Sequence, residues 1–225
     1  MNEIPYQLMR ADIYGALRRE ILDCTIPPGA EIRDAEIAER FAVSRSPVRD
    51  ALLRLEAEGL VVIAPRKGYR AAPISIADAS DLFDFRAVLE PACAASVVGE
   101  ASDEALRSLD AFRSIGGLAA AEQDGAPSFV RYNREFHLAI ARLCANRRIR
   151  EATIDLIEQF DRLVTVSISS SEVGAQRDAL IAEHGEIVDA LQRRDGKRAG
   201  RILARHAGRA RRRVLSALSR SPIVP

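Results

Sequence analysis

The chain has 225 residues, which allows two domains with sizeable cores. Hydrophobic residues make up 48% of it, as in a globular protein, and the few aromatic residues favour Ala- and Leu-rich helices over a β-sandwich. Its 33 basic and 32 acidic residues leave a net charge of +1, so a nucleic-acid site has to rest on local clusters of charge.

The sequence carries no signal for export or membrane insertion. No apolar run approaches the roughly 18–20 residues of a membrane helix, and the polar start of the chain lacks a signal peptide. Cys24, Cys93 and Cys144 are an odd and scattered set, which is typical of a reducing compartment rather than of a disulfide framework. We therefore expect a cytoplasmic protein with no membrane partner.

The first part of the chain has the element order of a helix-turn-helix. Apolar residues at helical spacing predict a first helix over residues 8–23, which Pro27-Pro28-Gly29 stops. A short helix over 35–41, with Asp34 as its N-cap, leads through a tight turn into a third helix that ends near Gly59.

This third helix has the features of a DNA-reading helix. Ser44 or Ser46 can cap its start, where Pro47 suits the first turn. Arg45 and Arg49 lie off its apolar stripe, which is formed by Val48, Ala51, Leu52 and Leu55. An anchored helix with arginines at its start suits the major groove, although the segment taken alone also fits a surface helix with solvated arginines.

A basic hairpin follows the third helix. Residues 60–63 and 69–72 predict two strands around the turn Pro65-Arg66-Lys67-Gly68. Beside a helix-turn-helix, such a hairpin is typical of a wing. An ordinary hairpin with solvated charges explains less, because the basic tip is close in sequence to the arginines of the third helix. The wing closes a first domain of residues 1–73.

Beyond a linker over residues 74–77, the pattern is helical. We expect a mainly α protein whose second domain, residues 78–220, is an all-α bundle of six or seven helices, followed by a tail over 221–225. The predicted helices span residues 78–98, 102–122, 126–144, 147–168, 174–193 and 196–219. Residues 163–168 fit either a strand or the end of a helix.

All three histidines lie in this second domain. Asn133 precedes His137 by about one turn, so the two side chains share a helix face. His184 and His206 lie eleven residues to either side of Asp195, and an antiparallel hairpin would place them level. Three imidazoles that converge with a polar fourth group form a site for a divalent metal; three unrelated, hydrogen-bonded histidines are the alternative.

Over about the first 73 residues, these motifs resemble the GntR family of bacterial winged-helix repressors. The resemblance rests on Pro27-Pro28-Gly29, on the SRSPVR stretch at 44–49 and on Arg66-Lys67-Gly68. It implies a third helix in the major groove and a wing tip in the minor groove, with DNA contacts by Ser44, Arg45, Ser46, Arg49, Arg66, Lys67 and Gly68. Family members often carry an arginine at the start of the second helix, where this chain has Asp34-Ala35, and Arg33 is the expected substitute.

The second domain is similar to the FCD ligand-binding domain of the FadR-like branch of that family. The resemblance rests on the segments 86–90, 133–137 and 183–184, on Asn146 and on His206. In many such domains an Asp and three histidines bind a metal, often zinc. Here Asn133 stands at the Asp position, and the resemblance implies a site for Zn²⁺, Ni²⁺ or Mn²⁺ formed by Asn133, His137, His184 and His206.

In such a sensor the open position on the metal takes the carboxylate of an organic acid. Arg86 would be the second anchor, because a guanidinium matches a carboxylate in a bidentate pair. A surface pair of Arg86 with Glu90 is the alternative, and Ser167 is placed at a helix end where it can line the pocket. Arg86, Glu90 and Ser167 are thus the candidate effector-binding residues, and the arginines of the last helix are interpreted as a solvated face.

The leading hypothesis is a homodimeric, ligand-responsive repressor of a metabolic operon. It would bind a double-stranded DNA operator in the bacterial nucleoid and sense a small carboxylate effector through the metal-containing pocket. No catalytic residue is expected, because no nucleophile with a paired base is evident. A metal-dependent hydrolase or lyase of a small carboxylate with a DNA-binding appendage is one alternative, and a metal-free small-molecule sensor is another.

Overall fold

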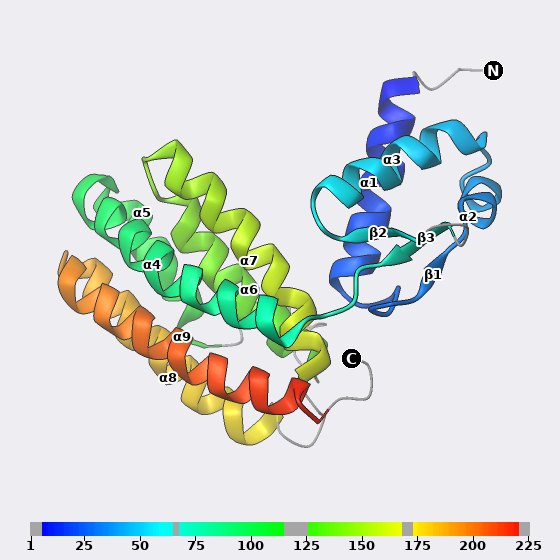
Figure 1. The fold of residues 1–225 in the computed structure, drawn as a ribbon. Helices are drawn as coiled ribbons and strands as arrows, with labels where there is room; N and C mark the ends of the chain where they lie inside the picture. The colour runs from blue at the N-terminus through cyan, green and yellow to red at the C-terminus, as the bar shows by residue number, and fades with distance from the viewer. Residues whose placement is uncertain (1–5, 65–67, 115–125, 168–172, 221–225) are drawn as a thin grey trace. The chain divides into compact units, whose positions relative to one another are not determined.

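The computed structural model describes residues 6–64, 68–114, 126–167 and 173–220 (Figure 1). Its first part contains three helices and three short strands: α1 (Tyr6–Leu22), β1 (Glu31–Ile32), α2 (Asp34–Arg40), α3 (Arg45–Ala57), β2 (Val61–Ala64) and β3 (Gly68–Ala71). The strands pair antiparallel in the order β1-β3-β2. The predicted winged helix-turn-helix is confirmed. The additional strand β1 was not expected, because two residues are too few to show an alternating pattern.

The apolar stripe predicted for the third helix is the buried face of α3. Val48, Leu52 and Leu55 are 0% exposed and belong to the same core as Ile13 and Leu17 of α1. Burial of each such side chain contributes about 1.5–3 kcal/mol. The stripe therefore anchors α3 and leaves its opposite face exposed.

The start of α2 corrects one expectation. Arg33, with an extended backbone, is the N-cap residue, and Asp34 is the first residue of the helix. The side chain of Asp34 does not cap the helix, because both of its oxygens pair with arginines of α3.

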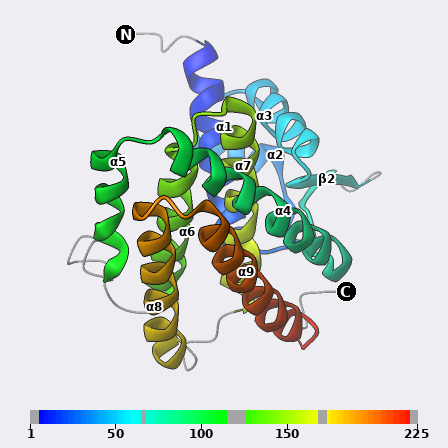
Figure 2. The ribbon, with the colours of Figure 1, turned by 90° about the vertical axis from the view of Figure 1, so that its left-hand side faces the viewer.

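Helices are the regular elements of the second part of the chain, within its described residues. Its elements are α4 (Ile76–Glu100), α5 (Asp103–Ser108), a 3-10 turn η1 (Leu109–Arg113), α6 (Ala126–Arg142), α7 (Arg147–Ser167), α8 (Val173–Gln192) and α9 (Gly196–Leu218) (Figure 2). The all-α bundle is confirmed, and residues 163–167 belong to α7 rather than to a strand.

The helix predicted over residues 102–122 is shorter than expected. Regular α-helix ends at Ser108 and continues as η1, in which side chains three residues apart lie above one another. Leu106 of α5 and Leu109 of η1 are buried at 1% and 0%, so both side chains face the core across the change in winding. Residues 115–125 lie outside the described residues.

The turn between α8 and α9 sets the register of the last two helices. A side-chain oxygen of Asp195 accepts a hydrogen bond of 2.9 Å from the backbone N–H of Arg198 and caps α9. The next residue is Gly196, where an added Cβ would lie 2.9 Å from Val98 Cγ2, so α9 begins in close contact with α4. α4 and α9 then pack along each other through the bundle.

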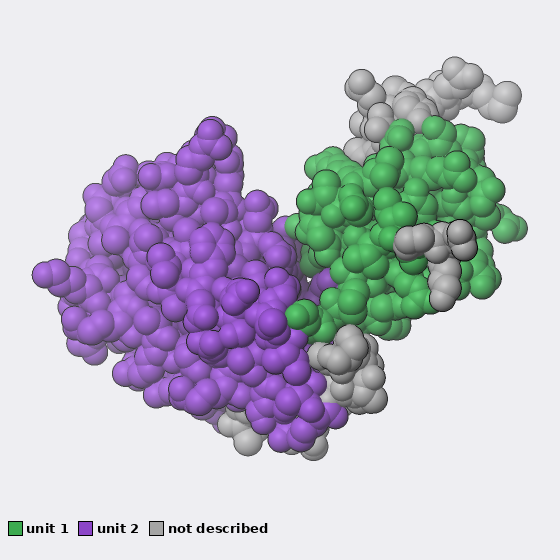
Figure 3. All heavy atoms as spheres, viewed as in Figure 1, with its two compact units in different colours: residues 1–75, 222–225 green, residues 76–221 purple. Residues whose placement is uncertain are grey.

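The described residues of the chain form two compact units (Figure 3). The first ends at Ser75 and the second begins at Ile76, inside the expected linker 74–77. In the described ranges, no helix has both the length and the apolar character that a membrane span requires.

Candidate functional site

The exposed start of α3 presents the arginines expected to read DNA. Arg45 and Arg49 are about one turn apart, and their side chains are 56% and 55% exposed. Ser44 is the N-cap residue of α3, without a side-chain cap hydrogen bond, and both Ser44 and Ser46 are exposed. Their hydroxyls are therefore available to a phosphate at the start of the helix.

A carboxylate from α2 holds both arginines. Asp34 Oδ1 accepts from Arg45 Nη2 at 2.7 Å, and Asp34 Oδ2 accepts from Arg49 Nε at 2.7 Å. Partial burial raises the pKa of Asp34, but the hydrogen bonds from Arg49 and Arg45 outweigh this effect and hold the pKa below its usual value. Asp34 therefore remains ionised and fixes the two guanidinium groups side by side.

One groove brings together four of the expected DNA contacts of the first unit, Arg33, Arg45, Arg49 and Gly68. Asp34 lines the same groove. Arg33 is 62% exposed and pairs with Glu31 and Glu36. Gly68 has a φ of +83° at the start of β3, a conformation that favours glycine at the end of the wing turn. The other expected wing contacts, Arg66 and Lys67, lie outside the described residues.

In the second unit, the three histidines converge as predicted. His137 comes from α6, His184 from α8 and His206 from α9, and all are buried, at 3%, 0% and 3% exposure. One ring nitrogen of each lies within 4.8 Å of the others. The equal spacing of His184 and His206 from the Asp195 turn does place them together.

Two carboxylates orient the rings of His137 and His206. Glu90 Oε1 lies 2.7 Å from His137 Nδ1, and Glu183 Oε2 lies 2.8 Å from His206 Nδ1. Burial lowers the pKa of His137 to about 4 and that of His206 to about 3, so both rings are neutral near pH 7. The single proton of each ring is therefore favoured on Nδ1, which leaves a lone pair on each Nε2.

The Nε2 atoms of His137 and His206 are close neighbours. His137 Nε2 and His206 Nε2 are 3.3 Å apart, and two acceptors cannot hydrogen-bond to each other. Arg86 Nη2 donates to His137 Nε2 at 2.8 Å. A cationic group thus already stands against the paired histidines, where a metal cation would be bound.

His184 is the histidine of this cluster whose ring lacks a hydrogen-bond partner among the described residues. Neither ring nitrogen has a hydrogen-bond partner among the described residues, although the side chain is fully buried. The ring stacks on Phe136, with centroids 3.7 Å apart and planes inclined by 14°. A buried and unsatisfied polar atom costs about 1–3 kcal/mol, and a metal at the cluster would take the lone pair of one nitrogen. The residues present therefore fit a divalent metal.

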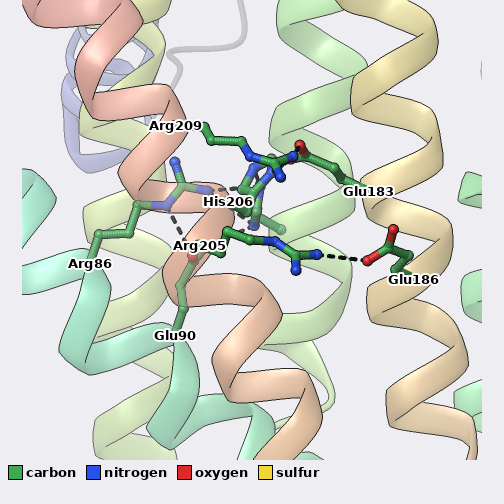
Figure 4. Close-up of polar contacts among 8 residues, drawn as sticks. Arg86, Glu90, Glu183, Glu186, Arg205, His206 and Arg209 are labelled. Atoms are coloured by element: carbon green, nitrogen blue, oxygen red, sulfur yellow. Dashed lines mark hydrogen bonds and ion pairs between the residues drawn. The ribbon is translucent and has the colours of Figure 1, made fainter.

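The candidate effector residues occupy different places around this cluster. Arg86, Asn133, Ser167 and His206 line one cavity of about 330 Å³. Glu90 is not among its described lining residues; it lies beneath Arg86, with Arg86 Nε donating to Glu90 Oε2 at 3.0 Å (Figure 4). The alternative pair of Arg86 and Glu90 thus exists, but it is buried at 3% and 5% side-chain exposure rather than on the surface.

Glu183 has a role that sequence reasoning missed. It lies next to His184 in sequence and points elsewhere, to His206 and Arg209 of α9 (Figure 4). Arg209 and His206 are about one turn apart, so a single carboxylate reaches both. Because His184 and His206 lie equally far from the Asp195 turn, their neighbours on α8 and α9 are also close in space, and this could have suggested the contact between Glu183 and His206.

Two family models match the chain. Residues 9–70 match the bacterial regulatory proteins of the gntR family, and residues 81–209 match the FCD domain. The HTH-type transcriptional repressor RspR of Escherichia coli K12 is 30% identical over 202 residues, which are 90% of this chain and 87% of RspR. The HTH-type transcriptional repressor GlaR of the same organism is 27% identical over 202 residues, which are 87% of this chain and 90% of GlaR.

Solved structures share the fold. A GntR transcriptional regulator from Rhodococcus sp. RHA1 superimposes with a TM-score of 0.77 at 23% identity, over 92% of this chain and 98% of that one. McbR/YncC of E. coli gives the same TM-score at 20% identity, over 92% and 97% of the two chains.

Proposed function

The chain belongs to the GntR family of bacterial transcriptional regulators and carries an FCD domain, and from this premise we propose that it is a homodimeric repressor controlled by a small carboxylate at a metal-containing pocket. The family and the relatives make it a DNA-binding regulator and not an enzyme. It would act in the bacterial nucleoid, where its operator lies.

The start of α3 would contact the bases of the operator. A guanidinium donates two parallel hydrogen bonds to O6 and N7 of guanine, and Arg45 and Arg49 are exposed and held at a fixed spacing by Asp34. Ser44, Ser46 and Arg33 would contact phosphates, and Arg66, Lys67 and Gly68 the minor groove. One small domain makes few such contacts, so two copies on two half-sites would supply the affinity.

The effector pocket would be built on a divalent ion held by His137, His184 and His206, with the side-chain oxygen of Asn133 as a fourth group. Zn²⁺, Ni²⁺ and Mn²⁺ all accept such ligands. The observation that carries this proposal is the buried His184, whose ring nitrogens have no partner among the described residues and whose ring lies beside the Nε2 atoms of His137 and His206, which are 3.3 Å apart. A bound metal would offer an open position to a carboxylate, and Arg86 would be its second anchor.

A pair of aromatic substitutions tests the metal site. His184→Phe keeps a ring against Phe136 but removes the nitrogens, whereas Tyr132→Phe removes a hydroxyl from the neighbouring ring and leaves the histidines intact. Gently purified wild-type protein should contain about one metal per chain by elemental analysis. Saturating Zn²⁺ or Ni²⁺ should raise its melting temperature by about 5–10 °C.

We expect His184→Phe to lose both the bound metal and the thermal shift, and Tyr132→Phe to retain them. Wild-type protein without stoichiometric metal and without a thermal shift would exclude the metal site and favour the metal-free sensor. The same metal content in His184→Phe and wild type would exclude His184 as a ligand.

A further inference from the structure

The arginines on α9 differ in whether the chain itself neutralises them. Arg205 pairs with Glu186 at 2.7 Å, Arg209 with Glu183, and Arg211 with Asp84 at 2.6 Å. No carboxylate among the described residues pairs with Arg213. Its charge is therefore left for a partner from outside the described part of the chain.

Arg213 stands on the same wall of the cavity as His206. Both residues line it, with Ala210 between them and Ala217 beyond, at helical spacings of four, three and four residues. Seven residues of helix separate His206 from Arg213, or about 10.5 Å along the axis of α9. The cavity thus has one polar end at His206 and Arg86, and Arg213 lies about two turns further along α9; Arg212 and Arg220 line the cavity as well.

The charge at this second position is uncompensated as well as close to the first. Arg213 is exposed at the cavity, yet the atoms packed around it lower the pKa of its guanidinium, and the charges of Arg86 and Arg209 add to the effect. Arg86 already has Glu90 as its counter-ion. An anion at Arg213 would relieve this repulsion, which an effector with only one carboxylate at the histidine end would not do.

The lining of the cavity also includes a group of apolar side chains. These are Phe83, Phe160, Val164 and Val214, and the Arg86 guanidinium lies 5.0 Å from the centroid of the Phe160 ring. A hydrocarbon spacer fits such side chains, whereas a polyhydroxylated or phosphorylated sugar would lose hydrogen bonds to water without regaining them.

From these contacts we propose that the effector is an aliphatic dicarboxylate, with one carboxylate at the histidine cluster and the second on Arg213. This inference rests on the proposed carboxylate-sensing function and adds the charge and shape of the ligand. It makes Arg213 the residue that separates dicarboxylates from monocarboxylates.

Titration calorimetry with matched ligands tests the proposal on the full chain supplied with Zn²⁺. The probes are succinate, glutarate and adipate, each compared with its monoamide, which has nearly the same shape but one negative charge fewer. For at least one chain length, wild-type protein should bind the dicarboxylate about tenfold more tightly than the monoamide, because a charged pair replaces a neutral one.

In Arg213→Met this ratio should fall to about 1 through loss of dicarboxylate affinity, while monoamide affinity stays the same. Arg201→Met is the matched control, because Arg201 is an exposed arginine of α9 outside the described cavity lining, and it should keep the wild-type ratio. Arg213→Lys keeps the positive charge but loses the bidentate guanidinium, so it should give an intermediate ratio of dicarboxylate to monoamide affinity. This variant tests the role of Arg213 even if Arg213→Met folds poorly.

The possible results distinguish a failure of the dicarboxylate proposal from a failure of the proposed carboxylate sensing. Dicarboxylates and monoamides that bind wild type equally well would leave carboxylate sensing intact and overturn the dicarboxylate. An unchanged ratio in Arg213→Met would overturn the assignment to Arg213. Absence of binding by every carboxylate would overturn the sensing function and this inference together.

Discussion

Asp34 has an unusual place for a DNA-binding surface, because its negative charge lies between the two arginines expected to read bases. Its side chain is 12% exposed and accepts hydrogen bonds from both Arg45 and Arg49. This arrangement holds the two long side chains in one orientation before DNA arrives, at the cost of repulsion from phosphates. We therefore expect Asp34 to trade general affinity for selectivity.

The substitution Asp34→Asn tests this trade. With the carboxylate gone, binding to an unrelated duplex should strengthen, since one negative charge is removed from the interface. Binding to the operator should gain less, because the arginines are no longer held together, so the ratio of operator to unrelated affinity should fall by about tenfold, in the range of one lost base contact. The measurement is a gel-shift titration of both duplexes at several salt concentrations.

Glu39→Gln provides the control for the change in charge. Glu39 is an exposed carboxylate on the same short helix and does not line the groove that Arg45 and Arg49 share. It should alter both affinities by a similar small factor and keep their ratio. If Asp34→Asn also kept the ratio, Asp34 would have no role in orienting the arginines.

At the scale of residues, spacing predicted the positions of side chains better than it predicted their contacts. The histidines could be brought together from the sequence, because a helix period and the Asp195 turn fix their register. The partner Glu90 could not be assigned, since it reaches His137 on a different helix. Glu183 was not assigned either, although the register of α8 and α9 could have suggested its contact with His206. Asp34 was interpreted as a cap because local hydrogen bonding is the usual role of an aspartate before a helix.

At the scale of elements, periodicity predicted the long helices to within about two residues of their ends. α7 and α9 have apolar residues at regular spacing over more than five turns, which is a strong signal. The two-residue strand β1 has no such signal, and it depends on pairing with residues 69–70 far along the chain. The spacing of the buried Leu106 and Leu109 fits an α-helix and a 3-10 turn alike, so a periodic pattern does not show the change from α5 to η1.

A prediction about the stability of single elements concerns the turn between α8 and α9. Asp195 caps α9 through its side chain, so Asp195→Ala should lower the free energy of unfolding by about 1 kcal/mol. Asp195→Asn keeps an oxygen that can accept the same hydrogen bond and should lose much less. Urea denaturation followed by circular dichroism measures both. Equal losses in the two variants would show that the charge of Asp195, rather than its cap, stabilises the turn.

At the scale of the whole molecule, the proposed function gives DNA binding to the first unit and effector binding to the second, and an effector would couple them only through a difference in its affinity for two arrangements of the protein. The first unit carries the arginines and the wing, and the second carries the histidines and the cavity. An effector can change operator affinity only as far as it binds one arrangement of the reading domains better than another. Such control requires that two reading domains act together on one operator.

The spacing of the operator half-sites tests that requirement. If a homodimer holds two α3 helices in successive major grooves, the half-site centres should lie about one helical turn, 10–10.5 bp, apart. An insertion of about 5 bp between them would turn one half-site to the opposite face of the duplex, and affinity should fall toward that of a single half-site. An insertion of about 10 bp restores the face and changes only the distance, so it should weaken binding less than the half-turn insertion does. Gel-shift titrations of the three duplexes, with the protein mass in solution measured by light scattering, compare these states. Equal affinity for all three would mean that the reading domains bind independently, and in that case an effector in the second unit would have no relative placement of the two to change.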